Sequence, residues 1–472
     1  MLNYFPKYFT SKAIYLYLGA FLTVSIMFFS NAMAWYWFVF GLIAVVGFFH
    51  FSNILTKKWM HITSKRFTEN LLTTALILRV IWVVFSYFFY VAMTGHPFEF
   101  STGDAWGYNQ CGKEIAAGLR DGNWGIFNVY LDIMGPSDFG YISYLGVLYY
   151  IVGDSMIIAR LIKALLSAFT VVLIYRLAIR NFGEDIGRMA SIFCMLMPNL
   201  IYYCGLHLKE TEMVFLIVAF VERADYAMRS PRFSFANLAL PALLAGSLFF
   251  FRTVLGAAAL FSFITALLLS SVRIVKKGGR RFILIVWVAV AVIYFMGGRI
   301  ATEVEEVWDG RVENQQTSMQ WRAERKGGNQ YAKYASGAIF APMIMIIPFP
   351  TMINIETQPN QQMTHGGYYV KNVLAFFAIF SLFWLLKTGK WRDHLLIISF
   401  SLGYLVVIAL SAFAHSERFH LPALPFLLIL AAVGISQQKN KSKKYYLWYL
   451  VFLFVAIVGW SWFKLAGRGL FV

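Results

Sequence analysis

An acidic residue stands where the chain first leaves a long apolar segment for a polar region. Asp104 lies in the stretch Gly103-Asp104-Ala105-Trp106-Gly107-Tyr108, which follows an apolar segment from about 70 to 94. A carboxylate at the end of a membrane helix faces molecules that arrive from the lipid, and it can accept a proton from a hydroxyl group. Asp104 is therefore a candidate catalytic base. The alternative is that it caps the helix that follows, a common role for Asp.

Further charged residues are expected at turns on the same face. Charged side chains in apolar segments cost about 3 kcal/mol each on insertion scales, so they are usually paired or functional. Arg252 follows Phe249-Phe250-Phe251 at one outer turn and Arg418 lies at another, where a guanidinium can meet a phosphate. Lys209 is a further cation candidate at a third turn, and Glu210 beside it is expected to pair with Lys209 or Arg252.

Three residues near Arg418 resemble metal ligands in type. His415, Glu417 and His420 do not have the spacing of a zinc helix motif. Hydrogen bonds to a substrate, or plain interface polarity, are therefore favoured over a metal at this turn.

The composition excludes an ordinary soluble protein. Of the 472 residues, 59% are hydrophobic and 14% are charged, whereas about a quarter of the residues of a soluble domain are charged. The apolar segments are about 20 residues long, the length that a helix needs to cross the hydrocarbon core, and β-barrel strands would be about half as long. We therefore expect an all-α polytopic membrane protein.

The distribution of charge predicts the orientation. The net charge of +18 does not indicate nucleic acid binding, because the basic residues form short clusters between apolar segments. Such clusters are typical of cytoplasmic loops and also favour anionic lipid headgroups. The loop with Lys57, Lys58, Lys65 and Arg66 is thus expected in the cytoplasm together with the N-terminus, which places Asp104 on the extracytoplasmic face.

The apolar segments predict about thirteen transmembrane helices. They are expected at about 12–29, 33–50, 70–94, 155–178, 188–206, 210–223, 233–251, 253–273, 282–297, 369–387, 395–414, 421–436 and 446–464. The stretch 106–119 predicts an interfacial amphipathic helix. The stretches 141–152 and 338–355 predict re-entrant or surface segments, the first because the basic clusters require an odd number of crossings between Asp104 and Arg176.

These elements divide the chain into four parts. Residues 1–66 form a transmembrane hairpin with its cytoplasmic loop, and 67–298 form a transmembrane module whose first extracytoplasmic loop is 95–140. Residues 299–368 form a second extracytoplasmic loop region with a re-entrant segment, and 369–472 form the C-terminal helices. Because both large loops face outward, a function at the outer surface is favoured.

The order of these features resembles the GT-C superfamily of polyprenyl-phosphate-dependent glycosyltransferases, which includes protein O-mannosyltransferases and lipid A aminoarabinose transferases. The resemblance extends from about 70 to 436 and rests on several short motifs. These are Asp104 with Tyr108 and Ala116-Ala117-Gly118, Ala159-Arg160-Leu161 followed by Arg176 and Phe182-Gly183, Leu206 to Glu210, and Glu417-Arg418-Phe419-His420-Leu421-Pro422-Ala423-Leu424-Pro425. The last is similar to an Arg-aromatic-x-Leu-Pro-x-x-Pro signature before a late helix.

The resemblance implies an inverting membrane glycosyltransferase. Its donor would be a sugar on a polyprenyl phosphate that enters from the membrane lipid, and its acceptor a glycan, lipid or protein. Asp104 would be the base and Arg418 or Arg252 would hold the phosphate. Tyr108, Lys209, Glu210, His415, Glu417 and His420 would bind substrate. The expected location is the bacterial inner (cell) membrane, with the site facing the periplasm.

The chain departs from the family pattern in two places. Ala105 follows Asp104 where a second acid often stands, and Gly135-Pro136 replaces a His-Pro-Pro or Lys-Pro-Pro element. No metal ligands are assigned, but a role for a divalent metal stays open. The alternative function is a transporter or flippase of lipid-linked sugars. Transporters usually show repeated halves and broken helices near the midplane, and the sequence has no such symmetry.

Overall fold

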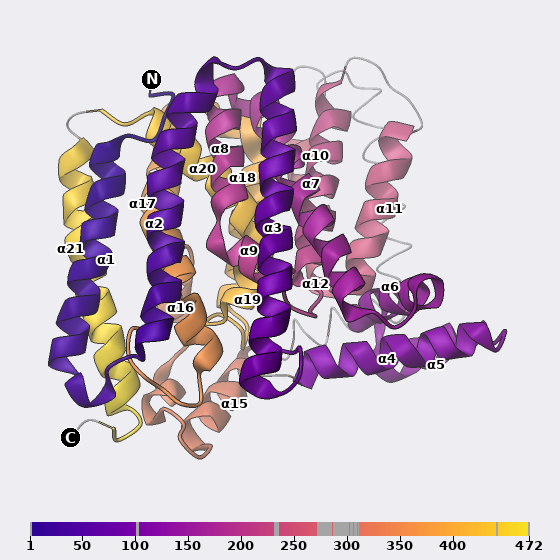
Figure 1. The fold of residues 1–472 in the computed structure, drawn as a ribbon. Helices are drawn as coiled ribbons and strands as arrows, with labels where there is room; N and C mark the ends of the chain where they lie inside the picture. Colours follow the sequence, from indigo (N-terminus) through magenta and orange to yellow (C-terminus); the bar gives the residue numbers. More distant parts are fainter. Residues whose placement is uncertain are drawn as a thin grey trace.

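The structure, a computed structural model, describes residues 2–100, 103–230, 236–270, 311–439 and 442–470, together with the single positions 286, 302, 305 and 309. Within these residues all regular elements are helices, and the β-bridge described is the isolated pair Ala32 and Ile353. The predicted all-α fold is confirmed (Figure 1).

Three long helices begin the chain. They are α1 (Lys7–Met27), α2 (Trp35–Lys58) and α3 (Ser64–Thr94), with short 3-10 turns η1 (Phe29–Asn31) and η2 (Trp59–His61) after the first two. Thr63 caps α3, since its side chain accepts a hydrogen bond from the backbone N–H of Arg66. Gly95 ends α3 with a φ of 78°, a left-handed conformation that favours glycine. The polar region with Asp104 starts there.

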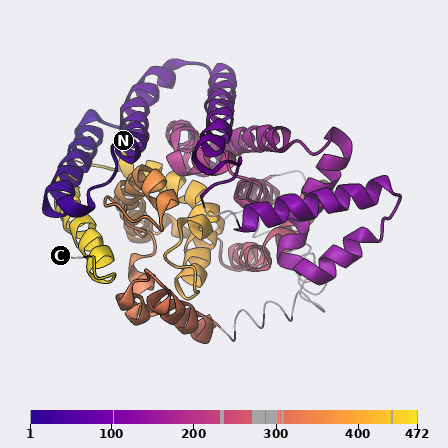
Figure 2. The ribbon, with the colours of Figure 1, turned by 60° about the horizontal axis from the view of Figure 1, so that its bottom comes forward.

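Three helices follow at the lower end of Figure 1 and project from the side of the bundle (Figure 2). They are α4 (Gly103–Arg120), α5 (Ile126–Met134) and α6 (Pro136–Val152). Helices α4 and α6 approach closely, because a Cβ added at Gly146 would lie 2.3 Å from Cγ2 of Ile115. α4 confirms the helix expected at 106–119, and α6 extends the short helix expected at 141–152.

The next segment contains a broken helix. Its elements are α7 (Met156–Phe182), α8 (Glu184–Leu196), α9 (Pro198–Cys204) and α10 (Glu210–Arg229). The prediction of one helix at 188–206 is wrong, because Pro198 has no N–H to donate to the carbonyl of Cys194. Arg79 of α3 is fully buried and donates instead to the carbonyls of Cys194 and Met195, at 3.3 and 3.2 Å.

The remaining helices complete the bundle. They are α11 (Ala236–Phe251), α12 (Thr253–Leu269), α15 (Arg311–Glu324), η3 (Gln330–Tyr334), α16 (Gly337–Met343), α17 (Pro359–Lys387), η4 (Lys390–His394), α18 (Leu395–Ala409), α19 (Glu417–His420), η5 (Leu421–Ala423), α20 (Leu424–Ser436) and α21 (Ser442–Ala466). Every residue of α20 is buried, so this helix forms the centre of the molecule. The helix expected at 282–297 lies outside the described residues, apart from position 286.

The start of α17 differs from the prediction. This helix begins at Pro359, about ten residues before the expected start at 369. Its first turns contain Gln362, His365 and other polar residues that hydrogen-bond inside the protein, so they need no contact with lipid. The polar groups that excluded these residues from the predicted helix have partners in Tyr17 of α1 and in the carbonyls of Ile355 and Gln362.

Eight helices in the described parts of the chain are long and apolar enough to cross a membrane. They are Lys7–Met27, Trp35–His61, Ser64–Thr94, Met156–Phe182, Pro359–Lys387, Lys390–Ala409, Glu417–Ser436 and Lys443–Ala466. The chain is thus an integral membrane protein, whereas the number of about thirteen crossings stays a prediction. Ala239–Phe251 and Thr253–Leu269 are shorter apolar helices.

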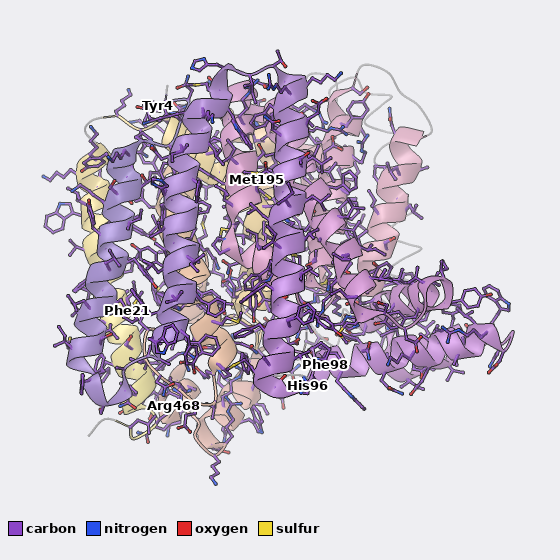
Figure 3. All side chains as sticks on the ribbon, in the orientation of Figure 1. Tyr4, Phe21, His96, Phe98, Met195 and Arg468 are labelled. Carbon is purple, nitrogen blue, oxygen red and sulfur yellow. The ribbon has the colours of Figure 1, made fainter. Side chains whose placement is uncertain are left out.

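The basic ends of α2, α7 and α10 and the described parts of the large polar regions lie at opposite ends of the bundle. The upper end in Figure 1 holds the turn between α2 and α3 and the C-terminal ends of α7, α10 and α17. The described basic residues there include Lys57, Lys58, Arg180 and Arg229. The lower end holds α4, α5, α15 and α19. The described parts of the two large polar regions therefore lie at one end, where Figure 3 labels His96 and Phe98.

Candidate functional site

The two residues that the sequence singled out most strongly are in contact. Asp104 lies in the first turn of α4, and Arg418 lies in the four-residue helix α19. Nη1 of Arg418 donates to Oδ2 of Asp104 at 2.5 Å. The Asp104 side chain is 57% exposed, so the carboxylate remains accessible from outside. The fold thus brings together two residues that are 314 positions apart.

Glu210 connects this pair to the second predicted arginine. It is the first residue of α10 and is completely buried, at a helix end that favours a negative charge. Nε of Arg418 donates to its Oε1, and Nη2 of Arg252 lies 3.8 Å from the same oxygen. Arg252 separates α11 from α12, and its guanidinium lies over the ring of Phe419, 4.3 Å from the centroid. The predicted pairing of Glu210 with Arg252 is confirmed.

Lys209 pairs with Asp138 rather than with Glu210. Its Nζ donates to Oδ1 of Asp138 at 2.5 Å and to the carbonyl of Ser137 at 2.7 Å. Tyr108 also donates to Oδ1 of Asp138, at 2.6 Å. Burial opposes ionisation of Asp138, but these contacts with Lys209 and Tyr108 outweigh burial and lower the pKa of its carboxyl. Tyr108 is only 6% exposed, so it holds α4 against α6.

Glu417 and His420 face the protein interior, away from Asp104. Oε2 of Glu417 accepts a hydrogen bond from Nζ of Lys371 at 3.1 Å, and Nδ1 of His420 lies 2.9 Å from the same ammonium. Asn199 donates to Oε1 of Glu417 at 3.0 Å. These four buried residues join α9, α17 and α19 beneath the turn that presents Arg418. His415, in the loop before α19, accepts a hydrogen bond from Arg322 of α15.

Sequence reasoning missed Lys371, Asp138 and Glu99. Lys371 was hidden by its place in an expected membrane helix, and Asp138 was a loop acid without a motif. Glu99 lies between the aromatic residues Phe98 and Phe100, a pattern that could have indicated burial near the site. It is 3% exposed, its Oε2 has no hydrogen-bond partner in the described structure, and burial raises its pKa.

Arg160 supports the loop that carries Glu99. The guanidinium is buried, and its Nη2 donates to the carbonyl of Pro97 at 2.5 Å. Its Nε and Nη1 have no partner in the described structure. The Arg160 guanidinium is therefore held inside the protein and does not extend to lipid headgroups, as a long cationic side chain near a membrane surface can.

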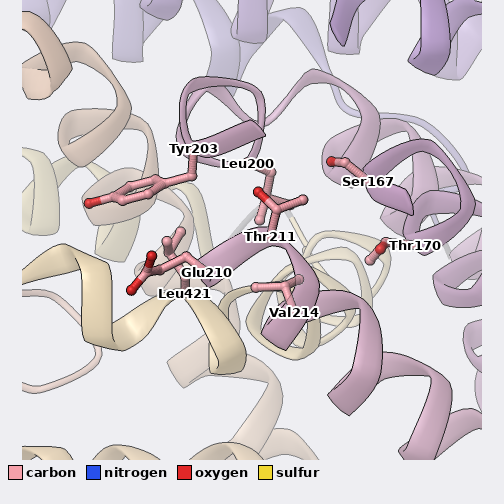
Figure 4. Close-up of a pocket in the computed structure, with 8 residues that line it drawn as sticks. All are labelled: Ser167, Thr170, Leu200, Tyr203, Glu210, Thr211, Val214 and Leu421. Atoms are coloured by element: carbon pink, nitrogen blue, oxygen red, sulfur yellow. The ribbon is translucent and has the colours of Figure 1, made fainter. Parts of the chain in front are cut away.

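A small cavity lies beneath the charged residues (Figure 4). Glu210, Thr211 and Val214 of α10 form one wall, and Ser167 and Thr170 of α7 form another. The remaining lining residues are Leu200, Tyr203 and Leu421. Its volume of about 10 Å³ is the space of about one water molecule. This cavity is too small for a substrate larger than water, so a substrate that reaches Asp104 must approach it from its exposed side.

No group of three or more His, Cys, Asp or Glu side chains that could hold a metal ion occurs in the described residues. The charged residues that do gather are Asp104, Glu210, Arg252 and Arg418, in which two guanidinium groups share one buried carboxylate. Such an arrangement offers an exposed acid beside two cations, which suits proton abstraction next to a leaving anion.

Comparison with known proteins gives a match in the C-terminal part of the chain. Residues 364–465 match the Alg9-like mannosyltransferase family, and this range contains Lys371 and Arg418. No curated protein and no solved structure matches the chain. The match agrees with the resemblance seen in the motifs, and it supports the assignment of the chain as a GT-C superfamily glycosyltransferase that uses a lipid-linked sugar donor.

Proposed function

We propose that the chain transfers a sugar from a polyprenyl-phosphate donor to a hydroxyl group of a glycan, lipid or protein at the extracytoplasmic face, with inversion at the anomeric carbon. The observation that carries this proposal is the contact between Asp104 and Arg418. It places an accessible acid and a cation side by side at the end of the bundle where the first outer loop lies.

The reaction needs one base and one cation. Asp104 accepts the proton of the acceptor hydroxyl while the oxygen of that hydroxyl attacks the anomeric carbon of the donor sugar. The bond between that carbon and the phosphate oxygen breaks, and the electron pair leaves with the phosphate. Arg418, with Arg252 beside it, stabilises the negative charge that develops there. The products are the glycosylated acceptor, polyprenyl phosphate and the proton on Asp104.

The ion pair between Asp104 and Arg418 belongs to the state of the enzyme before the donor binds. A donor phosphate that binds Arg418 replaces the carboxylate of Asp104 as its partner and leaves Asp104 free to act as the base. Glu210 keeps Arg418 in place during this exchange, because Nε of Arg418 is bound to Glu210 while Nη1 faces Asp104. Binding of the donor thus prepares the base.

The name of the matched family supports mannose as the sugar. The basic clusters at the opposite end of the bundle support an outward-facing site, and we propose the bacterial inner membrane with the site in the periplasm. Lys209 and Tyr108 act by fixing Asp138, and so the position of α6 beside α4.

The substitution Asp104→Asn tests this function in the purified chain with a synthetic polyprenyl-phosphate sugar. Turnover should fall by about 100-fold or more, since general base catalysis contributes about that factor. Asp121→Asn is the matched control, because Asp121 is an exposed acid just after the other end of α4. Normal turnover of Asp104→Asn would show that Asp104 is not the base.

The alternative, transport of lipid-linked sugars, is distinguished by the same assay. In detergent no compartment exists, so a transporter forms no glycosylated product. Product formation by the detergent-solubilised chain therefore supports a transferase. Movement of an unchanged lipid-linked sugar across vesicles, without product in detergent, would support the alternative.

A further inference from the structure

Four cationic residues gather near His415 at the lower end of the bundle in Figure 1. They are Arg322 and Arg325 of the α15 region, Lys464 in the last turn of α21, and Arg468 just after α21. Figure 3 labels Arg468 at the lower end of the molecule. The described basic residues at the ends of α2, α7 and α10 lie at the other end, so the preference of lysine and arginine for cytoplasmic loops does not explain these four.

Two hydrogen bonds to backbone carbonyls join the elements that carry these cations. The side chain of Asn329 donates to the carbonyl of Phe463 at 3.0 Å. The N–H of Gln330 donates to the carbonyl of Gly467 at 2.7 Å. The segment after α15 is thereby fixed against the end of α21, and the cations are held close by the fold.

None of the four cations forms an ion pair in the described structure. Lys464 is buried, and its Nζ donates to the neutral amide oxygens of Gln358 and Gln361, at 2.7 and 2.5 Å. Arg468 donates from Nη1 to the carbonyl of Lys464 at 2.8 Å, while its Nε is buried without a partner. Burial, and then repulsion by Arg325, lower the pKa of Arg468.

His415 adds a neutral donor to the cluster. Burial, followed by repulsion from Arg322 and other cations, lowers its pKa to about 3, so the ring is neutral at physiological pH. Arg322 donates to Nε2, which must therefore lack a proton, and the proton is on Nδ1. Nδ1 is buried and has no acceptor in the described structure. The cluster thus has excess positive charge and donors without acceptors.

We propose that Arg322, Arg325, Lys464 and Arg468 bind the phosphate group of an anionic lipid at the outer surface of the membrane. The position favours a lipid as the source, because the cluster lies at the end of an apolar helix long enough to cross the membrane. Trp321 of α15 and Trp462 of α21 are exposed, and tryptophan is typical of membrane interfaces. Arg325 is exposed and provides the first contact.

The full chain in nanodiscs tests this proposal through its melting temperature in phosphatidylcholine with and without phosphatidylglycerol. Phosphatidylglycerol should raise the Tm of the wild type, and Arg325→Gln combined with Arg468→Gln should remove most of the rise. Each lost charge should weaken phosphatidylglycerol binding about fivefold. Lys333→Gln, which removes an exposed cation from η3, is the control and should keep the wild-type rise.

A second arm replaces the lipid with inorganic phosphate. No rise in Tm with phosphate, beside a rise with phosphatidylglycerol that depends on Arg325 and Arg468, supports the lipid source. A rise with phosphate that the same substitutions remove would overturn the lipid as the source and indicate a soluble phosphate ligand. An equal rise with phosphatidylglycerol in the wild type and the double variant, or no rise in either, would overturn the proposal. Because Tm is the readout, the result does not depend on the proposed enzymatic activity.

Discussion

At Arg418, two acidic side chains share one guanidinium, and the exchange of one of them for a phosphate is the step that starts the proposed reaction. Asp104 is exposed, whereas Glu210 is buried at a helix N-terminus. Glu210 should therefore keep its contact when a phosphate arrives. This difference in burial assigns separate roles to two acids that look alike in the sequence.

We expect Arg418→Gln to lower turnover about 100-fold, the effect of removing one donor from a developing anion. Arg418→Lys should also be impaired, because an ammonium lacks the fork that contacts Asp104 and Glu210 at once. Turnover with a synthetic lipid-linked sugar measures both. Full activity of Arg418→Lys would contradict the role of the fork.

The ionisation of Asp138 should make the stability of the protein depend on pH. Its pKa is lowered in the folded state, so its carboxylate stabilises the fold above the ordinary pKa of about 3.9. This contribution is lost as the pH falls below that value towards the folded pKa. The Tm of Asp138→Asn should be lower than that of the wild type near neutral pH, and the difference should shrink below pH of about 4. A difference that stays constant with pH would contradict the assignment.

At the scale of elements, the short helix α19 directs neighbouring residues to different parts of the protein. Arg418 points towards the site, while Glu417 and His420 bind Lys371 inside the bundle. The sequence predicted the importance of this motif, but neighbouring residues of a four-residue helix point in different directions. Which of them faces the site depends on Lys371, in a helix about fifty residues earlier in the chain.

Lys371→Met should lower the free energy of unfolding by about 3–5 kcal/mol, because it leaves the carboxylate of Glu417 buried and unpaired. Lys371→Met combined with Glu417→Leu removes both charges and should recover most of that loss. Denaturant unfolding in detergent measures both variants. A double variant as unstable as the single one would show that the ion pair is not the cause.

The helix break at Pro198 shows a second limit of sequence reasoning. The proline is visible in the sequence, but the carbonyls left free at the break, those of Cys194 and Met195, accept from Arg79. Arg79 lies more than one hundred positions earlier in the chain. The apolar pattern on both sides of Pro198 therefore predicted one continuous helix. The early start of α17 has a similar origin, since His365 contacts Tyr17 of the distant helix α1 and Gln362 donates to the carbonyl of Ile355 before the helix.

At the scale of the whole molecule, composition was sufficient for the fold class, and the basic clusters predicted which polar regions share an end. The presence of Asp104 and Arg418 at one end of the bundle was predicted because both belong to recognisable motifs, whereas their direct contact was not. Asp138 and Glu99 were not anticipated, since their importance comes from burial and partners that a single sequence does not specify.

The orientation can be tested by cysteine labelling in a Cys111→Ser background, which removes the native cysteine that is partly exposed. Asp121→Cys, after α4, should react with a membrane-impermeant reagent in intact cells. Lys65→Cys, at the start of α3, should react only after the membrane is opened. Labelling of both from the same side would contradict the predicted topology.

The central claim is that Asp104 and Arg418 form one catalytic site for a lipid-linked donor. A structure of the chain with a non-reactive polyprenyl-phosphate sugar analogue tests it most directly. The account predicts that the phosphate contacts Arg418 and Arg252 and that the anomeric carbon faces Asp104. The hydrogen bond between Asp104 and Arg418 should then be broken. An analogue bound elsewhere, with the contact between Asp104 and Arg418 intact, would contradict the claim.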